Sequence, residues 1–148
     1  MNALKQSPAA WNCIVDRYDS ESEWLEARKS GIGASEVAAI FGVGYASQSP
    51  VTVWASKTGI SEIEIDEETK KLFRRGHKME PVIASEFEDE TGLVCVDPGQ
   101  FTIYRHSTID WLFSTLDRFT VHPEFGPVPV ELKNVNGRLR GEWDVEQD

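Results

Sequence analysis

The longest helical pattern in the chain lies between residues 67 and 91, and it restricts the fold more than any other segment. Five residues spaced 3, 4, 3 and 4 apart share one helical face: Phe73, Gly76, Glu80, Ile83 and Phe87. Gly92 follows, and glycine readily takes the left-handed conformation that closes a helix. We therefore predict one long helix over 67–91.

A carboxylate occupies the middle of this apolar face. Burying Glu80 costs free energy unless the group is paired or bound to a cation, and Gly76 permits close approach beside it. Pro81 lacks a backbone donor and is expected to kink or loosen the helix. Glu80 is therefore a candidate functional residue.

Shorter helices are predicted before the long one, and strands after it. The expected helices cover 22–30, 36–41 with Ser35 as the N-cap, and 50–58 between a Ser49-Pro50 start and Gly59. The expected strands cover 93–96 and 100–105 as a hairpin, then 111–121 and 128–135 around a turn at 122–127. Hairpin-connected strands after helices favour an α/β chain of the α+β kind, with a mixed or antiparallel sheet.

Two acids and a lysine near the C-terminal end have a spacing that suits a metal-dependent nuclease. Because alternate residues of a strand share a face, Glu131 and Lys133 are predicted on the polar face of 128–135, and Asp117 in an apolar row of 111–121. A carboxylate can bind Mg²⁺, and an ammonium can position water or stabilise charge at phosphorus. An ordinary solvent-exposed strand face would also explain Glu131 and Lys133, so the Glu-x-Lys tripeptide alone does not establish a metal site.

Composition suits one globular domain in a reducing cytoplasm. The 148 residues are 40% hydrophobic and 27% charged, and no apolar run approaches the roughly 20 residues of a membrane span. Cys13 and Cys95 lie far apart without a CxxC motif. The net charge of −10 argues against a simple DNA-binding surface, although basic residues gather at 28–29 and 70–78. We expect one domain over 1–148, with 1–21 as an N-terminal extension.

Four segments in order resemble the YqaJ-type viral recombinase family of phage lambda exonuclease-like proteins. They are Trp24-Leu25-x-x-Arg28 with GIGASE at 31–36, PVTVWASKTG at 50–59, Gly76-x-x-x-Glu80-Pro81, and Asp117 with Glu131-Leu132-Lys133. The resemblance covers residues 23–133. It implies a restriction-endonuclease-like core, a central mixed β-sheet flanked by helices. It also implies an exonuclease dependent on Mg²⁺, or on Mn²⁺ in its place, that digests one strand of linear duplex DNA from a 5′ end.

The resemblance also implies a catalytic set. Asp117, Glu131 and Glu80 match its metal ligands, and Lys133 matches the lysine that orients or activates the attacking water. Metal binding would also account for a carboxylate at position 80 in an apolar stripe.

Three further residues match the positions that bind the terminal 5′ phosphate: Arg28, Ser35 and Thr115. Arg28 can give a two-pronged contact to phosphate. Ser35 is predicted at a helix N-terminus, where free N–H groups favour an anion, although a plain N-cap explains Ser35 as well.

Partners and alternatives complete the prediction. The resemblance implies a ring trimer on double-stranded DNA ends and a single-strand annealing protein as partner. The family's domain continues past the lysine with a helix and another strand, whereas this chain ends at Asp148, so we expect the last part of the core to be missing. The alternatives are a related endonuclease without a 5′-end preference, a domain that binds DNA or a partner protein without cutting, and an acidic DNA mimic.

Overall fold

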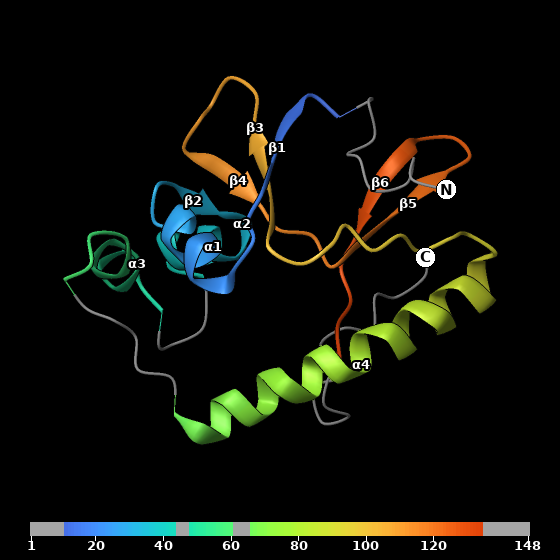
Figure 1. The fold of residues 1–148 in the computed structure, drawn as a ribbon, viewed down its shortest axis with the longest axis horizontal. Helices are drawn as coiled ribbons and strands as arrows, with labels where there is room; N and C mark the ends of the chain where they lie inside the picture. Colours follow the sequence, from blue (N-terminus) through green and yellow to red (C-terminus); the bar gives the residue numbers. More distant parts are fainter. Residues whose placement is uncertain (1–10, 44–47, 61–65, 135–148) are drawn as a thin grey trace.

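Short helices and strands alternate in the first part of the chain, and one long helix separates them from the later strands (Figure 1). The computed structural model describes residues 11–43, 48–60 and 66–134. The order is β1 (Cys13–Arg17), α1 (Glu21–Arg28), β2 (Ile32–Gly33), α2 (Ala34–Ile40), α3 (Pro50–Lys57), α4 (Glu67–Thr91), β3 (Thr102–His106), β4 (Leu112–Ser114), β5 (Arg118–His122) and β6 (Gly126–Val130). The predicted mixed α/β class is confirmed.

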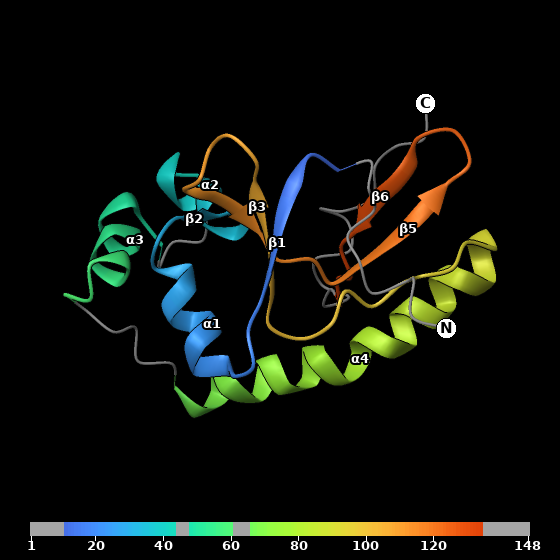
Figure 2. The ribbon, with the colours of Figure 1, turned by 45° about the horizontal axis from the view of Figure 1, so that its top comes forward.

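The strands form two sheets. A four-stranded sheet has the order β1-β3-β4-β2, in which β3 is antiparallel to both neighbours and β2 is parallel to β4. The antiparallel pair β5–β6 forms the second sheet. Helix α4 runs along one side of both sheets, and α1, α2 and α3 gather near β2 and β4 (Figures 1 and 2). A mixed sheet flanked by helices is therefore present, as expected.

Local capping explains where the helices begin and end. Ser20, Ser49 and Asp66 each accept a hydrogen bond from the backbone N–H three residues ahead, and so begin α1, α3 and α4. Gly92, at φ +69°, ends α4 in the left-handed conformation. The predicted start of a helix at Ser49-Pro50 and the predicted end of the long helix at Gly92 are confirmed, and α4 continues through Pro81.

The prediction of Ser35 as an N-cap is wrong. Helix α2 begins at Ala34, two residues earlier than predicted, and Gly33 is its N-cap. The carboxylate of Glu36 accepts a hydrogen bond from Gly33 N at 2.7 Å. Glu36 therefore satisfies a free backbone donor at the start of the helix, while Ser35 lies exposed in its first turn.

The predicted strand over 111–121 is also wrong, because the chain changes sheets within it. β4 pairs with β3 and β2, whereas β5 pairs with β6, and residues 115–117 link the two sheets. Asp117 thus lies on a link and not in a regular strand row. Of the row expected on one face, Phe113 and Phe119 are buried, whereas Trp111 and Val121 are more than half exposed.

Two further strand predictions need correction. β6 ends at Val130, where its last partner is Arg118, so residues 131–134 have no strand partner among the described residues; residue 135 of the predicted strand lies outside them. The expected hairpin of 93–96 with 100–105 does not form. Val96 instead makes a single bridge to Phe119, and β3 pairs with β1 and β4.

An N-terminal tryptophan connects the two sheets. Trp11 packs edge-on against Tyr104 of β3 and Phe119 of β5, with ring centroids 5.7 and 5.8 Å away, and its indole N–H donates to Pro127 O at 2.8 Å. The segment expected as an extension over 1–21 thus contributes Trp11 and β1 to the packed sheets. Ile103, Tyr104 and Phe119 lie in the buried core.

Two glycines let α1 and α2 approach β4 closely. A Cβ at Gly31 would collide with the backbone carbonyl of Trp111, which accepts a hydrogen bond from Ile32 N at 2.6 Å. A Cβ at Gly33 would lie 3.1 Å from the Phe113 ring. These contacts place the end of α1 and the start of α2 beside the link at 115–117.

The apolar face of α4 is only partly covered by the described residues. Ala84 is buried, Ile83 and Phe87 are half-buried, and Phe73 is 54% exposed. These residues lie on one face of α4, as predicted, but the first part of that face is exposed to solvent. No helix in the described part of the chain is long and apolar enough to cross a membrane.

Candidate functional site

The Arg28 guanidinium lies between two aromatic rings where α1 meets β4. Its centre is 4.6 Å from the Trp24 ring centroid and 5.6 Å from that of Phe113. One N–H donates to Thr115 Oγ1 at 3.3 Å, across 87 residues of sequence. The structure therefore brings together two of the three predicted phosphate-binding residues. The aromatic faces stabilise the cation and restrict its orientation.

Arg28 carries more N–H donors than its surroundings use. Among the described residues, Thr115 is the one side-chain acceptor of its guanidinium. Burial lowers the pKa of Arg28, and the nearby Glu36 carboxylate partly opposes that shift. A partly desolvated guanidinium with spare donors favours an anionic ligand, because charge-assisted hydrogen bonds then replace lost hydration.

A partly buried ion pair between α2 and α3 adjoins Arg28. The Lys57 ammonium lies 2.8 Å from Glu36 Oε2 and donates to Arg28 O at 2.6 Å. The two side chains are 14% and 22% exposed, so water screens them little. Three helices thus meet at one charged cluster, which we call the Arg28 cluster: Arg28, Glu36, Lys57 and Thr115.

Ser35 stands apart from these contacts. It is exposed in α2, next to Glu36 in sequence, and within the described residues its hydroxyl has no hydrogen-bond partner. The structure places Ser35 on the helix that contributes Glu36, but it does not bring the hydroxyl into the Arg28 cluster.

Asp117 is tied to the Glu-x-Lys segment by a hydrogen bond. Its Oδ2 accepts from Leu132 N at 2.8 Å, across 15 residues of sequence. This bond follows directly on the β5–β6 ladder, so the Asp117 side chain replaces a strand partner where β6 ends. Asp117 and the flanking residues Glu131 and Lys133 are therefore held in one region, although neither of those two lies on a strand.

The remaining predicted catalytic residues contact partners that are close to them in sequence. Lys133 Nζ donates to Glu131 Oε1, and both side chains are more than half exposed. Glu80 Oε1 lies 2.9 Å from His77 Nδ1, and the Glu80 side chain is 26% exposed. Among the described residues, no three acidic, imidazole or thiol groups gather as a metal-binding cluster. The donor chemistry suits a hard cation, but the three acids are not assembled around one point.

The link between the two sheets carries both parts of the candidate site. Thr115 and Asp117 are two residues apart on it, one contacting Arg28 and the other contacting Leu132. After β6 the chain runs from the β5–β6 sheet toward α4, the helix that bears Glu80 (Figures 1 and 2). The fold thus directs the segment with Glu131 toward the helix with Glu80.

Sequence reasoning missed Glu36 and Lys57 as members of the charged cluster. Glu36 stands at the third position of α2, where a carboxylate can reach back to the N-cap N–H. Lys57 is the last residue of α3 and lies in the Lys-x-Gly pattern at 57–59. The contact of Glu36 with the N-cap N–H can be predicted from the local sequence pattern. The ion pair between Glu36 and Lys57 cannot, because 21 residues separate them in the chain.

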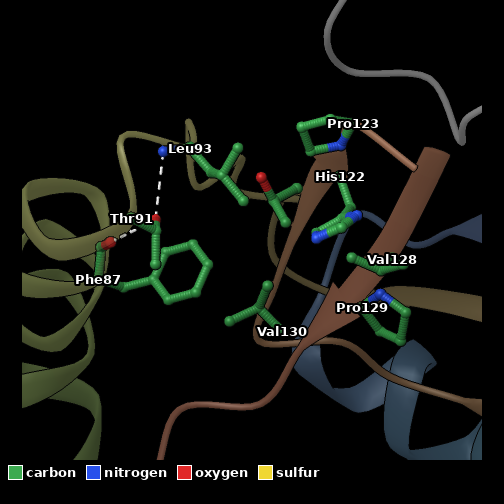
Figure 3. A pocket seen from close by; sticks show the side chains of 9 residues that line it. Phe87, Thr91, Leu93, His122, Pro123, Val128, Pro129 and Val130 are labelled. Atoms are coloured by element: carbon green, nitrogen blue, oxygen red, sulfur yellow. Dashed lines mark hydrogen bonds between the residues drawn. The ribbon is translucent and has the colours of Figure 1, made fainter. Parts of the chain in front are cut away.

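One cavity has a lining that contains none of the predicted site residues, although it includes Val130, the residue before Glu131. It has a volume of about 560 Å³ and is open to solvent between the end of α4 and the β5–β6 hairpin (Figure 3). Its lining consists of Phe87, Thr91, Leu93, Thr120, His122, Pro123, Val128, Pro129 and Val130. The lining is mostly apolar and includes no lysine or arginine, so it does not suit a phosphate.

Comparison with known proteins places the chain in a family. The family model of the YqaJ-like viral recombinase domain matches residues 23–148. The protein named "Uncharacterized protein YqaJ" from Bacillus subtilis (strain 168) is 27% identical over 128 residues, which cover 86% of this chain. The chain spans 38% of that relative's length. No solved structure matches. This chain belongs to the YqaJ-like viral recombinase domain family, which is nuclease-related.

Proposed function

We propose that this domain is a metal-dependent exonuclease that digests one strand of linear duplex DNA from its 5′ end during phage-type recombination. Family membership supports a role in viral recombination. The single observation that carries the nuclease assignment is the Leu132 N to Asp117 Oδ2 hydrogen bond, because it holds the acid beside the Glu131-Leu132-Lys133 segment.

Mg²⁺, or Mn²⁺ in its place, is the proposed cofactor. Asp117, Glu131 and Glu80 would hold it, since their oxygens are the hard donors that Mg²⁺ prefers. The bound ion would supply Lewis-acid polarisation of the phosphate and a more acidic water. Assembly of the three acids would require Glu131 and Glu80 to exchange their present partners, Lys133 and His77, for the cation.

The side chains of this domain would act at two places on the DNA, the scissile phosphate and the terminal 5′ phosphate. Lys133, released from Glu131, would orient the attacking water and stabilise charge on the phosphoryl oxygens. Arg28 and Thr115, with Ser35 from the exposed turn of α2, would bind the terminal 5′ phosphate. Because Thr115 and Asp117 are two residues apart, the end-binding group and the acid lie on one short link.

The test compares linear and covalently closed duplex DNA in buffer containing Mg²⁺. We expect the chain to shorten linear DNA from its 5′ ends, to spare closed circles and to stop on chelation. Equal loss of closed circles would replace the exonuclease assignment with an endonuclease. Binding without any cutting would favour the non-catalytic alternative.

A point substitution tests the role of Lys133. Lys133→Ala is expected to lower the degradation rate by about 10²- to 10⁴-fold, the range for a group that assists proton transfer. The control is Glu67→Ala, which breaks a similar exposed ion pair with Lys70 in α4 without removing a basic residue and should leave the rate unchanged. An unaltered rate in Lys133→Ala would contradict the mechanism.

Larger assemblies belong to the same proposal. We propose that the product, a 3′ single-stranded overhang, passes to a single-strand annealing protein, and that copies of the chain assemble as a ring trimer on duplex DNA ends. Family membership supports both proposals. Light scattering with and without a short duplex tests the second.

A further inference from the structure

Lys57 makes two strong contacts that neither DNA chemistry nor the metal requires. Its ammonium binds the carboxylate of Glu36 at 2.8 Å and the backbone carbonyl of Arg28 at 2.6 Å. A lysine that is 14% exposed usually keeps its charge only when such partners compensate for lost hydration. Both contacts affect Arg28. One binds its backbone carbonyl, and the other binds Glu36, whose charge acts on the guanidinium.

The acid is the reason that Lys57 matters for phosphate binding. Glu36 acts electrostatically on Arg28, since its charge raises the arginine pKa against the larger effect of burial. An unpaired carboxylate at this place would attract the guanidinium and repel a phosphate dianion. Lys57 compensates the charge of Glu36 directly and so leaves Arg28 available to an anion.

Geometry adds a second contribution. Lys57 belongs to α3, Glu36 to α2 and Arg28 to the last turn of α1, so the two contacts hold three helices together. The ammonium also lies 5.4 Å from the Phe113 ring, which borders the guanidinium from another side. The end of α1 is therefore held in place from α3 through a lysine that need not touch the substrate.

We infer that Lys57 is a positioning residue of the 5′-phosphate site, which neutralises Glu36 and fixes the end of α1 so that the Arg28 guanidinium faces the terminal phosphate. This inference rests on the proposed function, because it assumes that Arg28 and Thr115 bind the phosphate. It adds Lys57 and Glu36 as the pair that sets the preference for phosphorylated ends.

The experiment measures binding and not cutting, so it is independent of catalysis. Short blunt duplexes with a 5′ phosphate or a 5′ hydroxyl are titrated with each variant in EDTA, and fluorescence anisotropy gives the ratio of the two Kd values. Lys57→Met should reduce the wild-type preference about tenfold, the size of one charge-assisted hydrogen bond, with little change for the hydroxyl duplex. Lys70→Met is the matched control, because its ion pair with Glu67 is also 2.8 Å long but exposed.

Removing the acid should rescue part of the loss. The double variant Lys57→Met with Glu36→Gln is expected to regain part of the phosphate preference, since no carboxylate then competes for Arg28 while the contact with Arg28 O stays absent. Lys57→Arg, which keeps the charge, should retain most of it. If Lys57→Met does not fold, Glu36→Gln alone decides. A preference equal to or above wild type supports the inference, and a fall below wild type overturns it.

The remaining outcomes separate this inference from the proposed function. If wild type prefers the 5′ phosphate and folded Lys57→Met keeps that preference, the role of Lys57 is overturned and the phosphate site stands. A Lys57→Met loss that the double variant does not recover contradicts the neutralising role. If wild type shows no preference, the phosphate site and the role of Lys57 are both overturned, while cutting of linear DNA remains a separate result.

Discussion

At the scale of single residues, Thr115 shows how a modest hydroxyl can define a site. It is half-buried on the link between the sheets and accepts the side-chain hydrogen bond of Arg28. Without that acceptor the guanidinium would keep its aromatic neighbours Trp24 and Phe113 but lose the group that sets its rotation.

Replacing Thr115 by valine tests this contact, because valine keeps the shape and removes the hydroxyl. Thr115→Val should lower the free energy of unfolding by about 1 kcal/mol, the usual cost of a lost hydrogen bond, and should weaken the preference for phosphorylated ends. Urea unfolding and the ratio of Kd values measure the two effects.

Thr91→Val is the control for Thr115→Val. The Thr91 hydroxyl donates to the backbone oxygen of Phe87 at 2.6 Å, at the exposed end of α4, a helix that contributes no residue to the Arg28 cluster. It should leave the phosphate preference unchanged. Equal effects of both substitutions on the preference would argue against a specific role for Thr115.

At the scale of elements, the ends of α4 are set locally and can be tested locally. Gly92 has φ +69°, whereas Gly76 lies inside the helix, and among the described residues no atom outside the neighbouring helix backbone lies within 4 Å of where its Cβ would be. The same glycine-to-alanine change therefore has opposite expected effects at the two positions.

Gly92→Ala should lower the free energy of unfolding by about 1–2 kcal/mol, because an L-residue is strained in the left-handed conformation. Gly76→Ala should raise it by about 0.5–1 kcal/mol through better helix propensity. Urea denaturation of both variants beside wild type gives the comparison. Destabilisation by Gly76→Ala would show that this glycine serves close approach and not flexibility.

At the scale of the whole molecule, the proposed metal site joins three regions that lie apart in the sequence: α4, the link between the sheets and the segment after β6. A metal ion bound there would stabilise the folded state as a whole. The net charge of −10 also attracts divalent cations without a specific site, so the control must separate the two effects.

Addition of Mg²⁺ should raise Tm, with a gain of about 2.7 kcal/mol when the ion is in hundredfold excess over its Kd. Asp117→Asn keeps the size of the side chain and removes its charge, so this variant should lose most of that gain. Thermal unfolding with increasing Mg²⁺ measures both proteins. The same rise in both would point to general charge screening.

Much of the helical structure was predictable, because its determinants lie within a few residues. Ser20, Ser49 and Asp66 cap helices by bonds to the third residue ahead, and Gly92 ends α4 through its own conformation. The prediction of Ser35 as the N-cap of α2 was wrong, although it also depended on residues close in sequence. Glu36, one residue further on, bonds the N-cap N–H of Gly33 that begins the helix.

The strands were less predictable, because a strand is defined by its partner. The run 111–121 has strand composition throughout, yet it divides where β4 leaves one sheet and β5 enters the other. Similarly, β6 ends at Val130 because Asp117 bonds Leu132 N with its side chain. The sequence pattern around 131–133 contains nothing that specifies this partner.

Local sequence patterns were enough to predict α1, α3 and α4, the Ser49 and Gly92 ends, the α/β class and the family motifs that single out Arg28, Asp117, Glu131 and Lys133. Tertiary structure alone decided the division into two sheets, the contact of Arg28 with Thr115 and the pairing of Lys57 with Glu36. The reason is range: a cap is satisfied within one helical turn, whereas a buried charge or a strand edge is satisfied only by a partner that the folded chain brings to it.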